Sequence, residues 1–139
     1  MTTKINFNGE ICDELSISVM DHGFLFGDSV YEVVSTHNNH PCFLDKHLDR
    51  LNNSAQAISL RIPHDREWLR KQLKLTLVAA GNEESYIRII VTRGIGEINI
   101  DPSSCENPNI ILIVMDVTSY SQSFYEKGIQ VALVSIKRN

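Results

Sequence analysis

The sequence predicts an α+β domain in which a mostly antiparallel sheet carries two helices packed on one side. Three observations lead to this prediction. Segments with strand-like patterns come first, two long helical patterns follow, and strand-like segments return after them. Strands grouped before and after a block of helices are typical of α+β domains. The length of 139 residues fits one domain with a substantial hydrophobic core.

The expected strands are recognised by alternating apolar and polar residues or by runs of β-branched residues. Asn8-Gly9 is a strong hairpin signal, because both residues tolerate positive φ. The nearly continuous apolar segment at 109–117 is expected to be buried on both faces of the sheet. The full set of expected strands is 4–7, 10–12, 15–19, 30–36, 42–44, 86–92, 109–117 and 129–136.

Two long helices are expected between the early and late strands. Apolar residues recur every three or four positions over 46–58, and Asp45 is placed to cap the N-terminus of that helix. The second helix covers 65–80, and Gly81 follows it at the position after a helix where glycine is favoured. A short helix is expected at 121–127.

The composition excludes several classes of protein. The hydrophobic fraction of 42% and the charged fraction of 22% are those of an ordinary globular domain. A net charge of −4 argues against nucleic-acid binding, which normally depends on clustered Lys and Arg. The longest apolar run, 110–115, is far shorter than the roughly 20 residues of a membrane span. Three scattered cysteines, with no signal-peptide pattern, lead us to expect free thiols and a cytoplasmic protein.

Common site motifs are missing from the sequence. The spacing of His37, His40 and Cys42 matches no common zinc pattern, and an exposed turn explains these residues better. Gly94-Ile95-Gly96 lacks the third glycine and the helix start of a dinucleotide-binding fingerprint. We therefore expect no metal site and no nucleotide loop.

Four residues stand out as candidates for binding a small molecule. Arg50 borders the apolar stripe of its helix, where a guanidinium can meet a bound phosphate or carboxylate, or simply reach solvent. Tyr86 and Arg88 lie two apart in an isoleucine-rich strand. They could clamp a carboxylate or belong to an exposed sheet face. Tyr31 could face the same cavity or be a core tyrosine with a satisfied hydroxyl.

Three segments resemble the class IV, or fold-type IV, pyridoxal-phosphate aminotransferases. Residues 20–33, MDHGFLFGDSVYEV, are similar to the opening signature of that family. Residues 47–55, HLDRLNNSA, look like its H-x-x-R-L helix, and residues 86–94, YIRIIVTRG, look like its central strand. Because these segments follow one another in the family's order, the resemblance implies that residues 1–139 are the N-terminal small domain of such an enzyme.

The resemblance also implies roles for individual residues. Arg50 matches the arginine that binds the phosphate of the cofactor, pyridoxal 5'-phosphate. Phe26 and Tyr31 match aromatic positions that line the substrate pocket. Tyr86 and Arg88 match a Tyr-x-Arg pair near that pocket in branched-chain enzymes. No residue of this chain matches a catalytic position.

The resemblance favours the branched-chain subgroup of the family. The D-amino-acid enzymes carry an Arg and a His in the loop after T-R-G, whereas residues 95–100 contain neither. We therefore expect a homodimeric enzyme that moves an amino group between a branched-chain L-amino acid and 2-oxoglutarate. D-amino-acid transamination, cleavage of 4-amino-4-deoxychorismate and a non-catalytic half-domain for binding or interaction remain alternatives on this scaffold.

The family's catalytic lysine is expected to lie outside these residues. That lysine forms a Schiff base with the cofactor and belongs to a second domain, shortly after an Arg-Asn like the one at 138–139. Lys127 and Lys137 do not match its position. We therefore expect that the catalytic C-terminal domain is absent from this chain. The 139 residues alone should be inactive and should bind the cofactor weakly or not at all.

Overall fold

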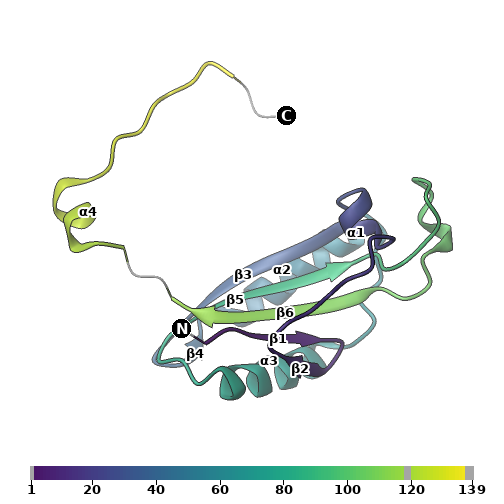
Figure 1. The fold of residues 1–139 in the computed structure, drawn as a ribbon, viewed down its shortest axis with the longest axis horizontal. Helices are drawn as coiled ribbons and strands as arrows, with labels where there is room; N and C mark the ends of the chain where they lie inside the picture. Colours follow the sequence, from purple (N-terminus) through teal and green to yellow (C-terminus); the bar gives the residue numbers. More distant parts are fainter. Residues whose placement is uncertain (1, 118–119, 137–139) are drawn as a thin grey trace.

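Six strands pair into one antiparallel sheet in the computed structural model, which describes residues 2–117 and 120–136 (Figure 1). Their order across the sheet is β2-β1-β6-β5-β3-β4. The strands are β1 (Lys4–Phe7), β2 (Glu10–Cys12), β3 (Ser29–His37), β4 (His40–Pro41), β5 (Ser85–Thr92) and β6 (Asn109–Asp116).

Two long helices, α2 (Leu44–Ala57) and α3 (Arg66–Ala80), pack on the same face of this sheet (Figure 1). Helix α2 lies against β3, and α3 lies against β1 and β6. The predicted α+β class, with both helices on one side, is thus confirmed. The shorter helical segments are α1 (His22–Leu25), η1 (Pro102–Ser104) and α4 (Gln122–Lys127).

The core fills the space between the sheet and the two long helices. Its fully buried side chains come from alternate strand positions and from one stripe of each helix: Val34, Ile87, Ile89, Leu112, Leu51, Ala55 and Leu73. The opposite face of the sheet stays partly open. Strand β6 was expected to be buried on both faces, and this holds at Ile111 on the open side but not at Met115, which is exposed next to the fully buried Val114. No helix in the described ranges is long and apolar enough to cross a bilayer.

The ends of α3 follow the sequence prediction, whereas the start of α2 does not. Asp65 caps α3 by accepting a hydrogen bond from the Trp68 amide at 2.8 Å, and Gly81 ends the helix with φ of 64°. Helix α2 begins before the predicted cap, because Phe43 occupies the N-cap position with φ of 51° and no side-chain cap. Asp45 instead bonds to Arg70 of α3. The prediction of Asp45 as an N-cap was therefore wrong.

Three predicted strands are also wrong. Residues 15–19 and 129–136 form no strand, and their apolar side chains include well-exposed ones such as Val19 and Leu133. Alternation alone cannot make a strand when no neighbour accepts its backbone hydrogen bonds. The return strand expected at 42–44 is instead β4, since the chain turns into α2 at Leu44. Lys137 and the Arg-Asn at 138–139 lie outside the described residues.

Candidate active site

The pleat of β3 and β5 places Tyr31, Tyr86 and Arg88 on the face of the sheet that α2 and α3 leave open. Directly paired residues of an antiparallel sheet share a face. Arg88 pairs with Val33 and Tyr86 pairs with Ser35, so these side chains lie on the same side as Tyr31. The intervening core positions point towards the helices.

Tyr31 and Arg88 are in direct contact on this open face. The guanidinium carbon of Arg88 lies 4.3 Å from the centroid of the Tyr31 ring, which is a cation–π arrangement. Tyr31 remains 55% exposed. Among the described residues, the buried Nε of Arg88 finds no hydrogen-bond acceptor. A buried donor without an acceptor is unfavourable, so a carboxylate placed here would gain a strong hydrogen bond.

Phe26 follows α1 at the end of the sheet where β3 begins (Figure 1). Its ring packs edge-to-face on His22, with centroids 4.8 Å apart. His22 is buried, and its Nε2 lies 2.8 Å from the carbonyl oxygen of Glu97. Phe26 is thereby oriented by a fixed neighbour.

The segment that carries Phe26 is anchored by a buried carboxylate. Asp21, which is 1% exposed, accepts hydrogen bonds from the Gly23 amide at 2.7 Å and from Thr92 Oγ1 and Asn109 Nδ2 at 2.8 Å. Its bonds join this segment to the end of β5 and the start of β6. A Cβ on Gly23 would lie 2.8 Å from the Thr92 side chain. Glycine at position 23 therefore permits the close approach of this segment to β5.

On the helix side of β3, Arg50 is held by a carboxylate that the sequence analysis missed. Glu32 is 4% exposed, and its two oxygens accept hydrogen bonds from Arg50 Nε and Nη2, each at 2.5 Å. His47 Nδ1 lies 2.8 Å from the same carboxylate. The signal in the sequence was a charged residue at a core-facing position of the strand 30–36, between valines that face the helices.

This pair remains ionised at neutral pH. The hydrogen bond from the Arg50 guanidinium lowers the pKa of Glu32, and Glu32 raises the pKa of Arg50. Arg50 is otherwise turned towards solvent, since its side chain is 67% exposed. Because Nε and Nη2 face Glu32, the planar guanidinium directs Nη1 away from the carboxylate, where an anion can meet it.

The lowered pKa of Glu32 makes the stability of the domain depend on pH. The stabilisation of the folded state by ionised Glu32 is fully present above the ordinary Glu pKa of about 4.3. It is lost as the pH falls through the lower pKa that Glu32 has in the folded state. We expect Glu32→Gln to remove this part of the acid sensitivity. Urea unfolding at several pH values between neutrality and about 3 measures it. Glu10→Gln, on exposed β2, is the control and should keep the wild-type profile.

Arg50 also lines a pocket of suitable charge for a phosphate. The pocket measures about 290 Å³ and is bounded by Phe43, Lys46, His47 and Arg50. The Lys46 ammonium lies 5.6 Å from the centre of the exposed Phe43 ring. Glu32 offsets one positive charge, which leaves a net positive site next to a titratable imidazole. The residues present therefore fit the phosphate of pyridoxal 5'-phosphate.

The structure brings Tyr31 and Arg88 into contact and places Tyr86 on the same face, opposite Ser35, but it does not group Arg50 with them. Arg50 reaches β3 from the helix side, whereas Tyr31 projects from the open face. Over most of its length, β3 pairs only with β5, since β4 covers just the last residues, Thr36 and His37, among the described strands. The free edge of β3 therefore separates the two groups, and one ligand along this edge could meet both.

Comparison with known proteins identifies the family. The family model described as amino-transferase class IV matches residues 29–139. The chain therefore belongs to the class IV aminotransferase family, whose members depend in general on pyridoxal 5'-phosphate. A Methanocaldococcus jannaschii protein named as a putative branched-chain-amino-acid aminotransferase is 35% identical, over 97% of this chain and 46% of that protein. A Listeria monocytogenes D-alanine aminotransferase is 39% identical over 60% of this chain and 29% of its own length.

Solved structures show the same fold. The branched-chain amino acid aminotransferase of Escherichia coli superposes with a TM-score of 0.89 at 22% identity, over 100% of this chain and 48% of that one. The 4-amino-4-deoxychorismate lyase of Pseudomonas aeruginosa gives a TM-score of 0.72 at 29% identity, over 90% of this chain and 44% of that one. The chain thus spans less than half the length of these relatives.

Proposed function

We propose that these residues form the small domain of an aminotransferase that moves an amino group between a branched-chain L-amino acid and 2-oxoglutarate. The observation that carries this proposal is the pair of sites on either side of the β3 edge. One is the cationic pocket at Arg50, and the other is the Tyr31–Arg88 contact on the open face. An anionic cofactor and a carboxylate substrate each need a cationic group, and these two lie on either side of the same strand edge.

Arg50 would hold the cofactor phosphate, with Glu32 fixing the orientation of its guanidinium. The bidentate contact to Glu32 leaves Arg50 little rotational freedom, so less entropy is lost when an anion binds. When bound, pyridoxal phosphate supplies the carbonyl carbon and electron sink that transamination requires. Lys46 adds positive charge to the same pocket.

The open face would select the substrates. The rings of Tyr31 and Tyr86 offer apolar contact to a branched side chain, and the guanidinium of Arg88 offers a cation to the carboxylate of 2-oxoglutarate. Phe26 would close one wall of this pocket. The sequence of the loop at 95–100, which has neither Arg nor His, supports a branched-chain over a D-amino-acid substrate.

The proposal assigns no catalytic residue to this chain. Transamination needs a lysine amine held near the reactive carbon of the cofactor. We propose that a further domain supplies this lysine, that the active protein is a cytoplasmic homodimer, and that the 139 residues alone are inactive.

Substrate assays test the proposal and separate its alternatives. The product of the whole open reading frame, given pyridoxal phosphate, leucine and 2-oxoglutarate, should form glutamate. The 139-residue protein should form none. Faster glutamate formation from D-alanine would favour a D-amino-acid enzyme. Pyruvate release from 4-amino-4-deoxychorismate would favour a lyase. Turnover of leucine by the 139 residues alone would contradict the assignment of the catalytic lysine elsewhere.

A further inference from the structure

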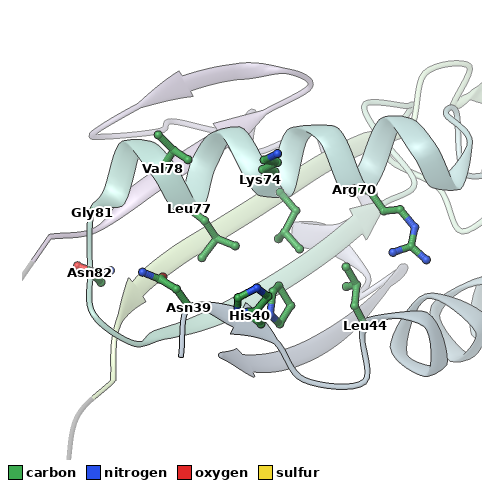
Figure 2. A pocket seen from close by; sticks show the side chains of 11 residues that line it. Asn39, His40, Leu44, Arg70, Lys74, Leu77, Val78, Gly81 and Asn82 are labelled. Atoms are coloured by element: carbon green, nitrogen blue, oxygen red, sulfur yellow. The ribbon is translucent and has the colours of Figure 1, made fainter. Parts of the chain in front are cut away.

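A second, larger pocket shares no lining residue with the Arg50 pocket and lies between α3 and the turn that joins β3 to β4 (Figure 2). We name it the α3–β4 pocket; it measures about 700 Å³ and is lined by residues of 39–44 and 70–82. This volume falls within the range of small-molecule sites, about 300–1,000 Å³. Tyr31 lies near the start of β3, whereas the pocket begins beyond its end, on the helix side.

The floor of the α3–β4 pocket is apolar. Leu73 and Leu77 of α3 and Leu44 of α2 supply it, and Val78 extends it at the exposed side of α3 (Figure 2). Leu73 is buried in the core, so this part of the floor is fixed by packing. The lining contains no tyrosine, tryptophan or phenylalanine on which a nucleobase could stack.

The ionisable side chains that line the pocket are all basic. His40, Arg70 and Lys74 line it, and no aspartate or glutamate does, although the chain as a whole carries a net charge of −4. A wall that carries an ammonium group and no acid is complementary to an anion.

The three basic groups differ in how much of their hydrogen-bonding capacity is already used. Arg70 is already paired with two carboxylates, because its Nη2 bonds to Asp45 and its Nε lies 3.4 Å from a carboxylate oxygen of Glu67. Lys74 makes no ion pair within the described part of the chain. His40 Nδ1 lies 2.7 Å from the Asn38 carbonyl oxygen, which orients the ring and leaves Nε2 for a ligand.

We propose that the α3–β4 pocket binds a small monocarboxylate with an unbranched or branched apolar chain. The carboxylate would meet Lys74, with His40 as a second polar group of the lining, and the chain would lie on Leu73 and Leu77. One free ammonium matches a monoanion better than a phosphate dianion. The apolar floor disfavours small hydrophilic ions, and the lack of aromatic surface disfavours nucleotides.

Binding would join two segments that are distant in the sequence. The lining comes from the β3–β4 turn and from the second half of α3, so an occupant would tie them together and stabilise the folded domain. Because this pocket and Tyr31 lie on opposite faces and at opposite ends of β3, occupancy of the two sites can be distinguished directly.

Octanoate is a suitable probe, and octanol is its neutral counterpart. We expect octanoate to shift the backbone amide NMR signals of Asn39, His40 and Asn82 in the 139-residue chain and to leave those of Tyr31 and Arg88 unchanged. It should also raise the melting temperature. Octanol should bind about tenfold more weakly, because it lacks the charge-assisted contact.

Matched variants of α3 test the contacts. Lys74→Gln should weaken octanoate binding about tenfold, whereas Lys71→Gln, an exposed lysine of α3 outside the pocket, should not change it. Val78→Trp, at an exposed position, should fill the pocket and abolish binding without unfolding the domain, which circular dichroism checks. The proposal is overturned if octanoate shifts only open-face signals, if octanol binds equally well, or if Lys74→Gln and Val78→Trp bind like the wild type.

Discussion

Replacing Gly94 with alanine is expected to destabilise the domain by at least about 3 kcal/mol, a cost that places it among the severe single substitutions. Gly94 follows β5 and has φ of 93°, a backbone angle that residues with a side chain rarely adopt. A Cβ at this position would also lie 2.0 Å from the carbonyl oxygen of Asn107. That oxygen belongs to the backbone just before β6, so it cannot rotate away as a side chain would.

Gly81 offers a matched control for this substitution. It also has a positive φ, of 64°, yet a Cβ there would meet no heavy atom within 4 Å. Gly81→Ala should therefore lower the free energy of unfolding only by the cost of holding alanine at a positive φ, about 1–2 kcal/mol. Urea unfolding of both variants measures the difference. Equal decreases in the free energy of unfolding of the two variants would contradict a tight contact between position 94 and Asn107.

Replacing Asp21 with alanine is expected to cost a similar amount, about 3 kcal/mol or more, because one buried and two partly buried donors lose their acceptor. These donors are the amide of Gly23, the hydroxyl of Thr92 and the side-chain amide of Asn109. The substitution should also loosen the segment that carries Phe26. Asp21→Asn should be little more stable than Asp21→Ala, because the new side-chain amide nitrogen would face hydrogen-bond donors in place of an acceptor.

Asp13→Ala is the control for this second substitution. Asp13 pairs with Lys4 at 2.5 Å, but its side chain is largely exposed. Exposed ion pairs contribute about 0–1 kcal/mol, so this loss should be small. Thermal and urea unfolding, with amide hydrogen exchange at Phe24 and Phe26, give the comparison. If Asp21→Ala were as mild as Asp13→Ala, the buried network would not anchor the segment.

The parts of the fold that local chemistry determines could be predicted from the sequence. The β1–β2 hairpin follows from Asn8-Gly9, and α3 follows from its apolar spacing between Asp65 and Gly81. The predictions of strands at 15–19 and 129–136 were wrong, because an alternating pattern shows only that a segment is suited to a sheet. Pairing itself depends on a neighbouring strand, which these segments lack in the described structure.

The candidate site could be predicted only in part. The two-residue period places Tyr86 and Arg88 on one face, but which face stays open depends on where α2 and α3 pack. The border position of Arg50 was visible in the helical spacing. Its orientation was not, because it comes from Glu32, which lies 18 positions earlier in the sequence and on another element.

The central claim is that Arg50, oriented by Glu32, binds the phosphate of pyridoxal 5'-phosphate. The most direct test is the cofactor dissociation constant of the product of the whole open reading frame, measured by absorbance titration for the wild type and for Arg50→Ala. The claim predicts that Arg50→Ala weakens cofactor binding at least about tenfold. Arg66→Ala, an α3 arginine paired with Asp49 outside this pocket, should leave the constant unchanged. Equal cofactor affinity for the wild type and Arg50→Ala would contradict the claim.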